Sequence, residues 1–157
     1  MSSTTETALM SLLAPLSGQA VPLEQVPDDV FSQKILGDGI AIIPADGKLY
    51  APVDGEIASI AETLHAYGFT SENGMEILVH VGLDSVALKG EGFKSHVQLG
   101  DKVKKGQLIA EVDLKFLESK GVPTITHVLI CEGAEDLKMN TVTGNVRAGK
   151  DAVITLG

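Results

Sequence analysis

The stretch YGFTSENGMEILVHV, residues 67–81, decides the fold of this 157-residue chain. At its centre, Asn73-Gly74 is a strong β-hairpin signal, because both residue types tolerate the positive φ angles of a two-residue turn. Beyond the turn, apolar residues occupy every second position, which is the period of a half-buried strand. These apolar positions are Met75, Ile77, Val79 and Val81. A hairpin with one buried face predicts an antiparallel sheet.

Further strand signals lie on both sides of this hairpin, roughly every ten residues, with Gly, Asp and Asn turns between them. We expect strands at residues 39–43, 55–64, 75–81, 107–112, 125–131 and 152–156. Short helices are predicted at 27–36, where Asp28 and Asp29 suit a capped start, and at 114–120, with Asp113 as the N-cap. The pattern predicts an all-β fold, an antiparallel β-sandwich or barrel with a few short helices.

A weak internal echo links two segments of the chain. APLSG at residues 14–18 resembles APVDG at residues 51–55, and each is followed by an apolar run. This similarity predicts two copies of a small β unit packed together.

The charge and the cysteine count restrict the classes of partner. A formal net charge of −9 repels phosphate backbones and anionic lipid, so we expect neither nucleic acid nor a membrane surface as partner. A basic protein surface fits this charge better. The single cysteine, Cys131, excludes an internal disulfide and suits a reducing compartment. Because it follows the apolar run Val128–Ile130, we interpret Cys131 as a buried structural thiol.

The first residues of the chain carry no Lys or Arg through residue 13. Their apolar stretch, residues 8–14, is short and interrupted by Ser11, so it fits neither a signal peptide nor a membrane span. We therefore expect residues 1–13 to form a flexible tail, residues 14–157 to form one domain, and the protein to be cytoplasmic.

Two of the four histidines are predicted to meet on one face of the sheet. His80 lies on the face opposite to the apolar set of the 75–81 strand, and Thr63 and His65 alternate together in the strand before it. If Asn73 and Gly74 are the two turn residues, position 67 lies opposite position 80. His65 then becomes the diagonal neighbour of His80, within reach of its ring.

Two histidines and a hydroxyl on such a face suit phosphoryl transfer. A neutral imidazole nitrogen is a competent nucleophile toward phosphorus when the other ring nitrogen is protonated. A second imidazole, His65, can donate to phosphoryl oxygens as charge develops. The Thr63 hydroxyl can select the tautomer of His65.

Other interpretations of the histidines stay open at this level. A histidine near an apolar strand is often structural, and we interpret His96 and His127 in that way. No acidic or nucleophilic residue is suitably spaced to His96. A zinc site is incomplete, because two histidines fall short of the three or four ligands that zinc requires. The residues themselves therefore predict no metal and no cofactor, and the one metal site left open is an interface at which a partner's carboxylate supplies a third ligand.

Several segments together resemble one known family. ETLHA at residues 62–66, LVHVGLDSV at 78–86 and LKGEGF at 88–93 closely resemble the glucose-type IIA component of the bacterial phosphoenolpyruvate-dependent sugar phosphotransferase system. Further matching segments are APLSG at 14–18, VPD at 26–28, GDGIAI at 37–42 and APVDG at 51–55. The resemblance extends from residue 14 to about residue 156 and implies an antiparallel β-sandwich with a duplicated hybrid motif.

The resemblance also implies an activity and its residues. His80 would accept a phosphoryl group from phospho-HPr and pass it to a cysteine on the IIB domain of a IIBC sugar permease. His65 would assist the transfer and Thr63 would support His65. The docking residues for partner proteins would be apolar Val30 and Phe31 and the carboxylates Asp28 and Asp84.

Two alternatives accompany this interpretation. A non-catalytic regulatory domain of the same fold would bind partners without carrying phosphate, although such a domain would be expected to have lost His80. GDKVKKGQL at residues 100–108 resembles a turn of biotinyl and lipoyl carrier domains, and Lys138 is a faint match to their modified lysine. A carrier of that kind leaves His65 and His80 unexplained.

Overall fold

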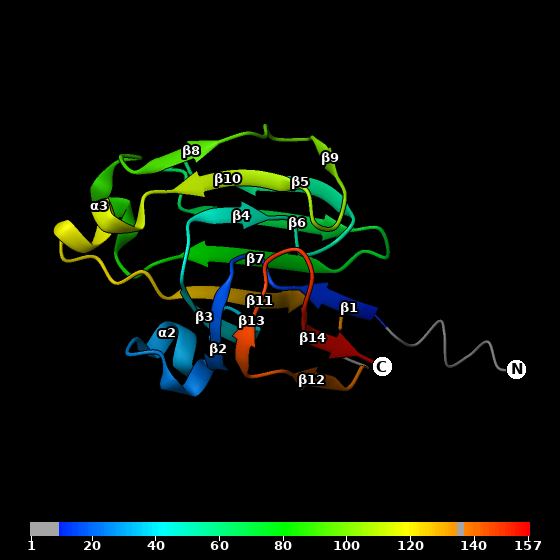
Figure 1. Cartoon of the computed structure of the whole chain (residues 1–157). Helices are drawn as coiled ribbons and strands as arrows, with labels where there is room; N and C mark the ends of the chain where they lie inside the picture. Colours follow the sequence, from blue (N-terminus) through cyan, green and yellow to red (C-terminus); the bar gives the residue numbers. More distant parts are fainter. Residues whose placement is uncertain (1–9, 135–136) are drawn as a thin grey trace, which may run out of the picture.

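A computed structural model describes residues 10–134 and 137–157, and within these ranges the chain folds into three antiparallel sheets (Figure 1). The large sheet contains, in spatial order, β13 (Gly144–Val146), β2 (Gly18–Pro22), β3 (Asp38–Pro44), β11 (Thr126–Glu132), β7 (Glu76–Val81), β6 (Ala66–Ser71), β5 (Gly55–Ile60) and β9 (Lys102–Val103). The small sheet contains β4 (Lys48–Tyr50), β10 (Leu108–Val112) and β8 (Phe93–Ser95). The terminal sheet contains β1 (Met10–Leu13), β14 (Ala152–Leu156) and β12 (Met139–Thr141).

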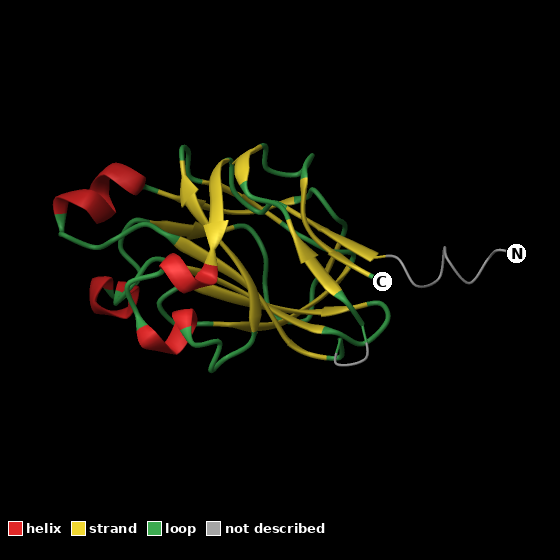
Figure 2. Ribbon diagram, turned by 90° about the horizontal axis from the view of Figure 1, so that it is seen from below, coloured by secondary structure: helices red, strands yellow, loops and turns green. Residues whose placement is uncertain are grey.

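The helical segments are short and gather at one end of the strands. They are α2 (Asp29–Ser32), α3 (Leu114–Ser119) and the 3-10 turns η1 (Leu23–Gln25) and η2 (Ser85–Leu88). Figure 2 shows them together at the end of the sandwich that lies away from the C-terminus. In the described part of the chain no helix is long and apolar enough to cross a bilayer. The expected all-β antiparallel fold with a few short helices is confirmed.

The two faces of the large sheet are buried against different partners. Its inner face packs against the other two sheets in a core that includes Ile57, Phe69, Val79 and Val128. On its outer face, α2 and η1 cover a smaller group that we call the outer cluster. It consists of Val21, Leu23, Val26, Phe31, Ala41, Leu83 and Leu129. The faces separate because successive side chains of a strand point in opposite directions.

The internal echo has a structural counterpart. The backbone N–H of Leu13 donates to the Pro52 carbonyl at 3.0 Å, and that of Tyr50 donates to the Pro15 carbonyl at 2.8 Å. The two Ala-Pro segments are thus joined by reciprocal bonds at the centre of the sandwich. Each precedes a turn and a strand of the large sheet, β2 and β5. The expected packing of two similar β units is observed at these segments.

Several predicted boundaries differ from the structure. Residues 10–13, expected to belong to the tail, form β1 with Leu12 fully buried, while residues 1–9 lie outside the described residues. The predicted helix 27–36 is only α2, because the backbone leaves the helix at Gln33 and Lys34 adopts φ 60°. Its expected cap is present, since the Asp28 carboxylate accepts from the Val30 N–H.

Two predictions about strands are wrong for local reasons. The predicted strand 55–64 ends at Ile60, because residues 61–65 turn the chain, with Leu64 at φ 61°, and start β6 at Ala66. Cys131, expected to be buried, is exposed. It lies where a bulge between Ile130 and Glu132 interrupts the pairing of β11 with β7.

Candidate functional site

The site is centred on His80, on the outer face of β7. The predicted alternation of this strand is confirmed, because Ile77, Val79 and Val81 are buried in the core while His80 is half-buried on the other side. Nδ1 of His80 is buried and has no hydrogen-bond partner among the residues that the structure describes. Nε2 is therefore the ring nitrogen that an incoming group can reach.

His65 meets His80 as expected, but by a different route. The ring centroids lie 4.9 Å apart in an edge-to-face arrangement. The predicted register is wrong by one residue, since Ala66 pairs with His80 and Tyr67 points into the core. His65 reaches the outer face because it precedes β6, directly after the left-handed Leu64, and so is not bound by strand alternation.

The register differs because the hairpin loop has three residues. Ser71 pairs with Met75 through its backbone N–H, which leaves Glu72, Asn73 and Gly74 in the loop. Gly74 adopts φ 88° and donates its N–H to the Ser71 carbonyl. This is the usual three-residue connection, a turn followed by one left-handed residue, in which glycine is favoured.

Thr63 lies beside His65, as predicted. Its Oγ1 is 2.7 Å from Nδ1 of His65. The turn of residues 61–65 brings the two together, since the Leu64 N–H donates to the Ala61 carbonyl and closes the loop before β6. The hydroxyl is therefore placed to select the His65 tautomer.

His127 is a third histidine of the site, and the sequence interpretation missed it. It lies on β11 directly opposite His80 and is fully buried. Its Nδ1 is 3.0 Å from the backbone carbonyl oxygen of His80, and the two ring centroids are 5.5 Å apart. The only sequence signal was a histidine inside an otherwise apolar strand, and its partner lies 47 residues away.

Phe31 lies under the histidines rather than at the surface. Its ring stacks on His127, with centroids 3.7 Å apart and an interplanar angle of 2°, and lies 5.0 Å from the His80 ring. Only 6% of Phe31 is exposed, whereas its neighbour Val30 is 40% exposed. We expected both on a docking surface, but the half-turn of α2 points Phe31 into the outer cluster.

Burial keeps the histidines neutral. It lowers the pKa of His80 to about 4, helped by the nearby His65, while the backbone of Gly82 and of His80 itself and the charge of Asp28 oppose the shift. Burial and the neighbouring His80 lower the pKa of His127 to about 4 as well. Burial also lowers the pKa of His65. At neutral pH each ring therefore retains a nitrogen lone pair.

The two expected carboxylates lie at the edges of the site. Asp28 caps α2, and its charge acts on both His80 and His127. Asp84 is exposed and precedes η2, two residues beyond Gly82. Val86 of η2 is 59% exposed. Asp28 is thus close enough to act on the histidines, while Asp84 and Val86 are exposed in the segment that follows β7.

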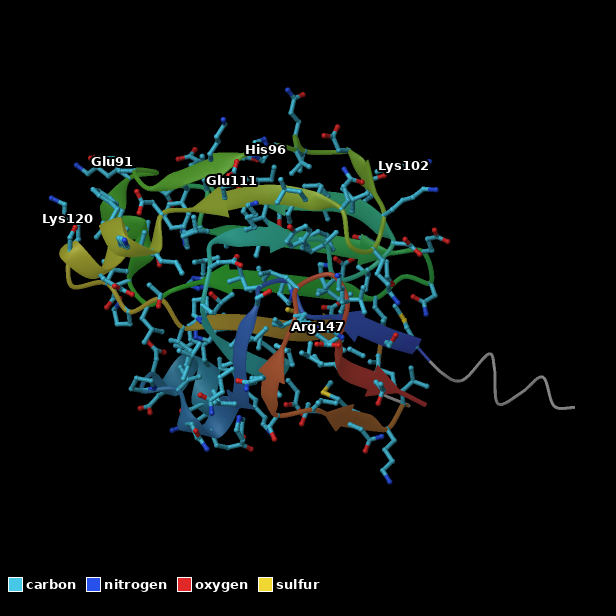
Figure 3. The ribbon with its side chains drawn as sticks, viewed as in Figure 1. Glu91, His96, Lys102, Glu111, Lys120 and Arg147 are labelled. Carbon is cyan, nitrogen blue, oxygen red and sulfur yellow. The ribbon has the colours of Figure 1, made fainter. Side chains whose placement is uncertain are left out.

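His96 lies in a different environment, near the small sheet. Its Nε2 is 2.7 Å from a carboxylate oxygen of Glu111 on β10, and both side chains are partly exposed (Figure 3). The expectation that no acidic residue is near His96 is wrong, because the pairing of β8 with β10 brings Glu111 beside it. Its structural interpretation fits this ion pair.

The arrangement suits nucleophilic chemistry at one nitrogen. Across residues 10–134 and 137–157 there is no group of three or more His, Cys, Asp or Glu side chains placed to hold a metal ion. What the site offers is a neutral imidazole, His80, with one reachable nitrogen, and a second imidazole at its edge.

Comparison with known proteins agrees with this chemistry. The family model for the phosphoenolpyruvate-dependent sugar phosphotransferase system, EIIA 1, matches residues 10–135. The chain is 44% identical over 145 residues to the "PTS system glucose-specific EIIA component" of Buchnera aphidicola subsp. Acyrthosiphon pisum, covering 92% of this chain and 90% of that protein. The structure of "glucose permease IIA from Mycoplasma capricolum" matches with a TM-score of 0.86 at 36% identity, covering 94% of this chain and 95% of that one.

Longer relatives contain a similar segment. The "PTS system glucose-specific EIICBA component" of Staphylococcus saprophyticus is 46% identical over 121 residues, which cover 77% of this chain but 18% of that protein. The "PTS system glucosamine-specific EIICBA component" of Bacillus subtilis is 49% identical over 129 residues, which cover 20% of that protein. The chain thus spans about a fifth of the length of these two relatives.

Proposed function

This chain belongs to the EIIA 1 family of the phosphoenolpyruvate-dependent sugar phosphotransferase system, and from that premise we propose that His80 carries its phosphoryl group. The protein is a phosphocarrier of that system. The observation that carries the proposal is the half-buried, neutral ring of His80. Its Nδ1 is enclosed, and its neighbour His65 lies 4.9 Å away.

The proposed step is a transfer between two nitrogen atoms. The Nε2 lone pair of His80 attacks the phosphorus of a phosphohistidine donor and forms a new N–P bond. The N–P bond of the donor breaks, and its electron pair returns to the donor nitrogen. The donor ring, protonated on its other nitrogen, leaves as a neutral imidazole. The phosphorylated His80 ring, which keeps its Nδ1 proton, takes over the positive charge that the donor ring carried. The low pKa of His80 supports this role, because a protonated ring has no lone pair to offer.

His65 assists this step without accepting the group. Thr63 donates its hydroxyl hydrogen to Nδ1 of His65, which leaves Nε2–H as the donor on the other side of the ring. That N–H can bond a phosphoryl oxygen on His80 as charge moves during transfer. Burial supports this tautomer, because it keeps His65 neutral.

The donor and the recipient are proteins in this proposal. Phospho-HPr supplies the group, and the cysteine of a IIB domain of a IIBC permease receives it, in the cytoplasm. Relatives named EIICBA, in which a similar segment forms part of a longer protein, support a IIB partner. The docking residues in this proposal are Asp28, whose charge acts on His80, and the exposed Val30 and Asp84. A basic partner surface would suit these carboxylates and the net charge of −9.

The test is transfer of labelled phosphate. The protein is incubated with phosphoenolpyruvate, enzyme I and HPr, and acid-labile phosphate is measured on the wild type, on His80→Ala and on His96→Ala as the matched control. We expect equal label on the wild type and on the His96 variant, and none on the His80 variant. Label that survives His80→Ala places the group elsewhere and overturns the proposal. An unlabelled wild type favours the regulatory binding domain instead.

A further inference from the structure

His127 contacts the site from the strand opposite His80, and the transfer described above does not use it. Three features coincide there: a hydrogen bond to the backbone of His80, a parallel stack on Phe31, and complete burial. A buried histidine placed only for packing would be expected to satisfy both ring nitrogens. His127 satisfies one.

The hydrogen bond determines the tautomer of His127. A backbone carbonyl oxygen can only accept, so Nδ1 of His127 must carry the hydrogen that it donates to the His80 carbonyl. In the neutral ring Nε2 then holds the lone pair. This Nε2 is buried and lacks a hydrogen-bond partner in the part of the chain that the structure describes. It is the one atom of the ring that can take up a proton.

Resting on the proposed function of His80, we propose that His127 is a positioning residue of the phosphotransfer site. It holds β7 at His80 through its Nδ1–H, and it takes up one solvent proton at Nε2 when His80 carries the phosphoryl dianion. The charge of His127 changes from 0 to +1, no bond to phosphorus is involved, and Nδ1 keeps its hydrogen throughout.

The charges around His127 explain why the proton is taken up only in the phosphorylated state. The titratable groups that act on it are His80, from β7, and Asp28, at the start of α2. Its neighbour on β3, Ala41, and the stacked Phe31 carry no charge. In the resting protein burial and the charge of His80 disfavour the charged ring, while the hydrogen bond to the His80 backbone and the charge of Asp28 favour it. A phosphoryl dianion on His80 reverses the effect of the His80 charge, because its negative charge raises the pKa of His127 instead of lowering it.

The expected size of the effect follows from the distance. The rings of His80 and His127 lie 5.5 Å apart in a partly dehydrated site. The phosphoryl group is bonded to the His80 ring, and an opposite charge carried by a neighbouring ring raises a histidine pKa by about 1 to 2 units. Below the raised pKa the phosphorylated form gains stability from the proton, and this gain is lost as the pH rises through it. Acceptance of phosphate should therefore become more favourable as the pH falls.

The direct test is histidine NMR on the wild-type protein. Imidazole resonances are titrated between pH 5 and 8 with and without phosphoenolpyruvate, enzyme I and HPr, and 31P NMR confirms the phosphohistidine. We expect His127 to stay neutral across this range in the resting protein, and to titrate at its acid end, near about pH 5 to 6, when His80 is phosphorylated. The resonances of His96, which is paired with Glu111 near the small sheet, serve as the internal reference and should not change on phosphorylation. A His127 ring that stays neutral across the range beside a clear phosphohistidine signal overturns this inference and leaves the proposed function intact.

Two variants test the consequence for transfer. His127→Phe keeps an aromatic ring against Phe31, and His127→Gln keeps an N–H donor, but neither can take up the proton. The phosphoryl distribution between HPr and each variant is measured from pH 5 to 8. We expect the wild type to accept phosphate up to about tenfold more favourably at pH 5 than the variants do, and equally at pH 8. If the ratio of phosphate acceptance between wild type and variants is constant across this pH range, His127 has only a packing role and the proposed proton uptake is wrong. A wild type without phosphohistidine overturns the proposed function together with this inference.

Discussion

The surroundings of His80 and of His96 illustrate how one residue type serves two purposes in the same chain. His96 is partly exposed and meets a carboxylate, Glu111, at 2.7 Å, so its charged form has a partner. His80 lies among two other imidazoles and Phe31, with Nδ1 enclosed and without a partner in the described residues. Burial lowers the pKa of His80 to about 4.

The difference teaches that the environment, and not the side chain, determines whether a histidine suits the proposed role of phosphoryl acceptor. A carboxylate beside an imidazole favours protonation and removes the lone pair. Neighbouring imidazoles and aromatic burial favour the neutral ring and preserve the lone pair. The following predictions test this contrast, from the largest expected effect to the smallest.

The first compares the buried and the exposed apolar residue of α2. Phe31→Ala removes the ring that supports His80 and His127 and leaves a cavity in the outer cluster. We expect the free energy of unfolding to fall by about 3 to 4 kcal/mol. Val30→Ala, at a side chain that is 40% exposed, should cost less than about 1 kcal/mol. Urea titration of both variants measures the difference, and equal losses would contradict the supporting role of Phe31.

The second compares the helper with the acceptor. His65→Gln leaves Nε2 of His80 in place, so phosphate from HPr should still be accepted. Onward transfer to a IIB domain should slow by about 100-fold, because a donor to the phosphoryl oxygens is removed. Rapid-quench measurement of both half-reactions distinguishes the two steps. Normal onward transfer would show that His65 is structural.

The third prediction concerns how the free energy of unfolding depends on pH at the buried histidines His80 and His127. In the unfolded chain His80 and His127 titrate near pH 6.5, but when folded the pKa of each is lowered to about 4. Between these values the unfolded chain binds more protons, so stability falls as the pH falls through this window. We expect about 2 kcal/mol of loss from each histidine between pH 7 and 5.

The control for this acid sensitivity comes from substitution. His80→Gln should reduce the slope of unfolding free energy against pH between 5 and 6.5, whereas Val30→Ala, which removes no titratable group, should leave the slope unchanged. Denaturant titrations at a series of pH values provide the slopes. If both variants reduce the slope equally, burial of His80 is not the cause of the acid sensitivity.

The fourth compares two hydrogen bonds of the same length. Thr63 to His65 and Glu111 to His96 are both 2.7 Å long. Thr63→Val should slow onward phosphoryl transfer by about tenfold, because His65 loses its preferred tautomer, and Thr63→Ser should restore it. Glu111→Gln should change the transfer rate by less than about twofold, because that pair lies outside the site. The rate of onward phosphoryl transfer is measured for each variant as for His65→Gln. Equal rates for Thr63→Val and Glu111→Gln would contradict the prediction.

Much of the site was predictable because it depends on local order in the chain. The alternation of residues 75–81 placed His80 on the outer face, and Asp28 and Asp113 cap α2 and α3 as their positions predicted. The hairpin register was not predictable from Asn73-Gly74, because a glycine at that position suits both a two-residue and a three-residue loop. The histidine pair formed nonetheless, because His65 lies outside β6.

The contacts of His127 and His96 could not be found in this way. His127 reaches His80 only because β11 pairs with β7, and Glu111 reaches His96 only because β10 pairs with β8. Neither pairing is encoded in residues next to these histidines. Because no partner is visible in the sequence, both histidines are interpreted there as structural. This interpretation fits the ion pair of His96 but overlooks the contact of His127 with His80.

The sequence by itself determined the strands that alternate, the helix caps, the family and the central place of His80. These depend on the order of neighbouring residues, which a local period or motif records. Only the tertiary structure decided that three histidines and Phe31 share one site, and that Nδ1 of His80 is enclosed. Such contacts join segments far apart in the chain, and loop lengths and strand register set them through the free energy of the whole fold.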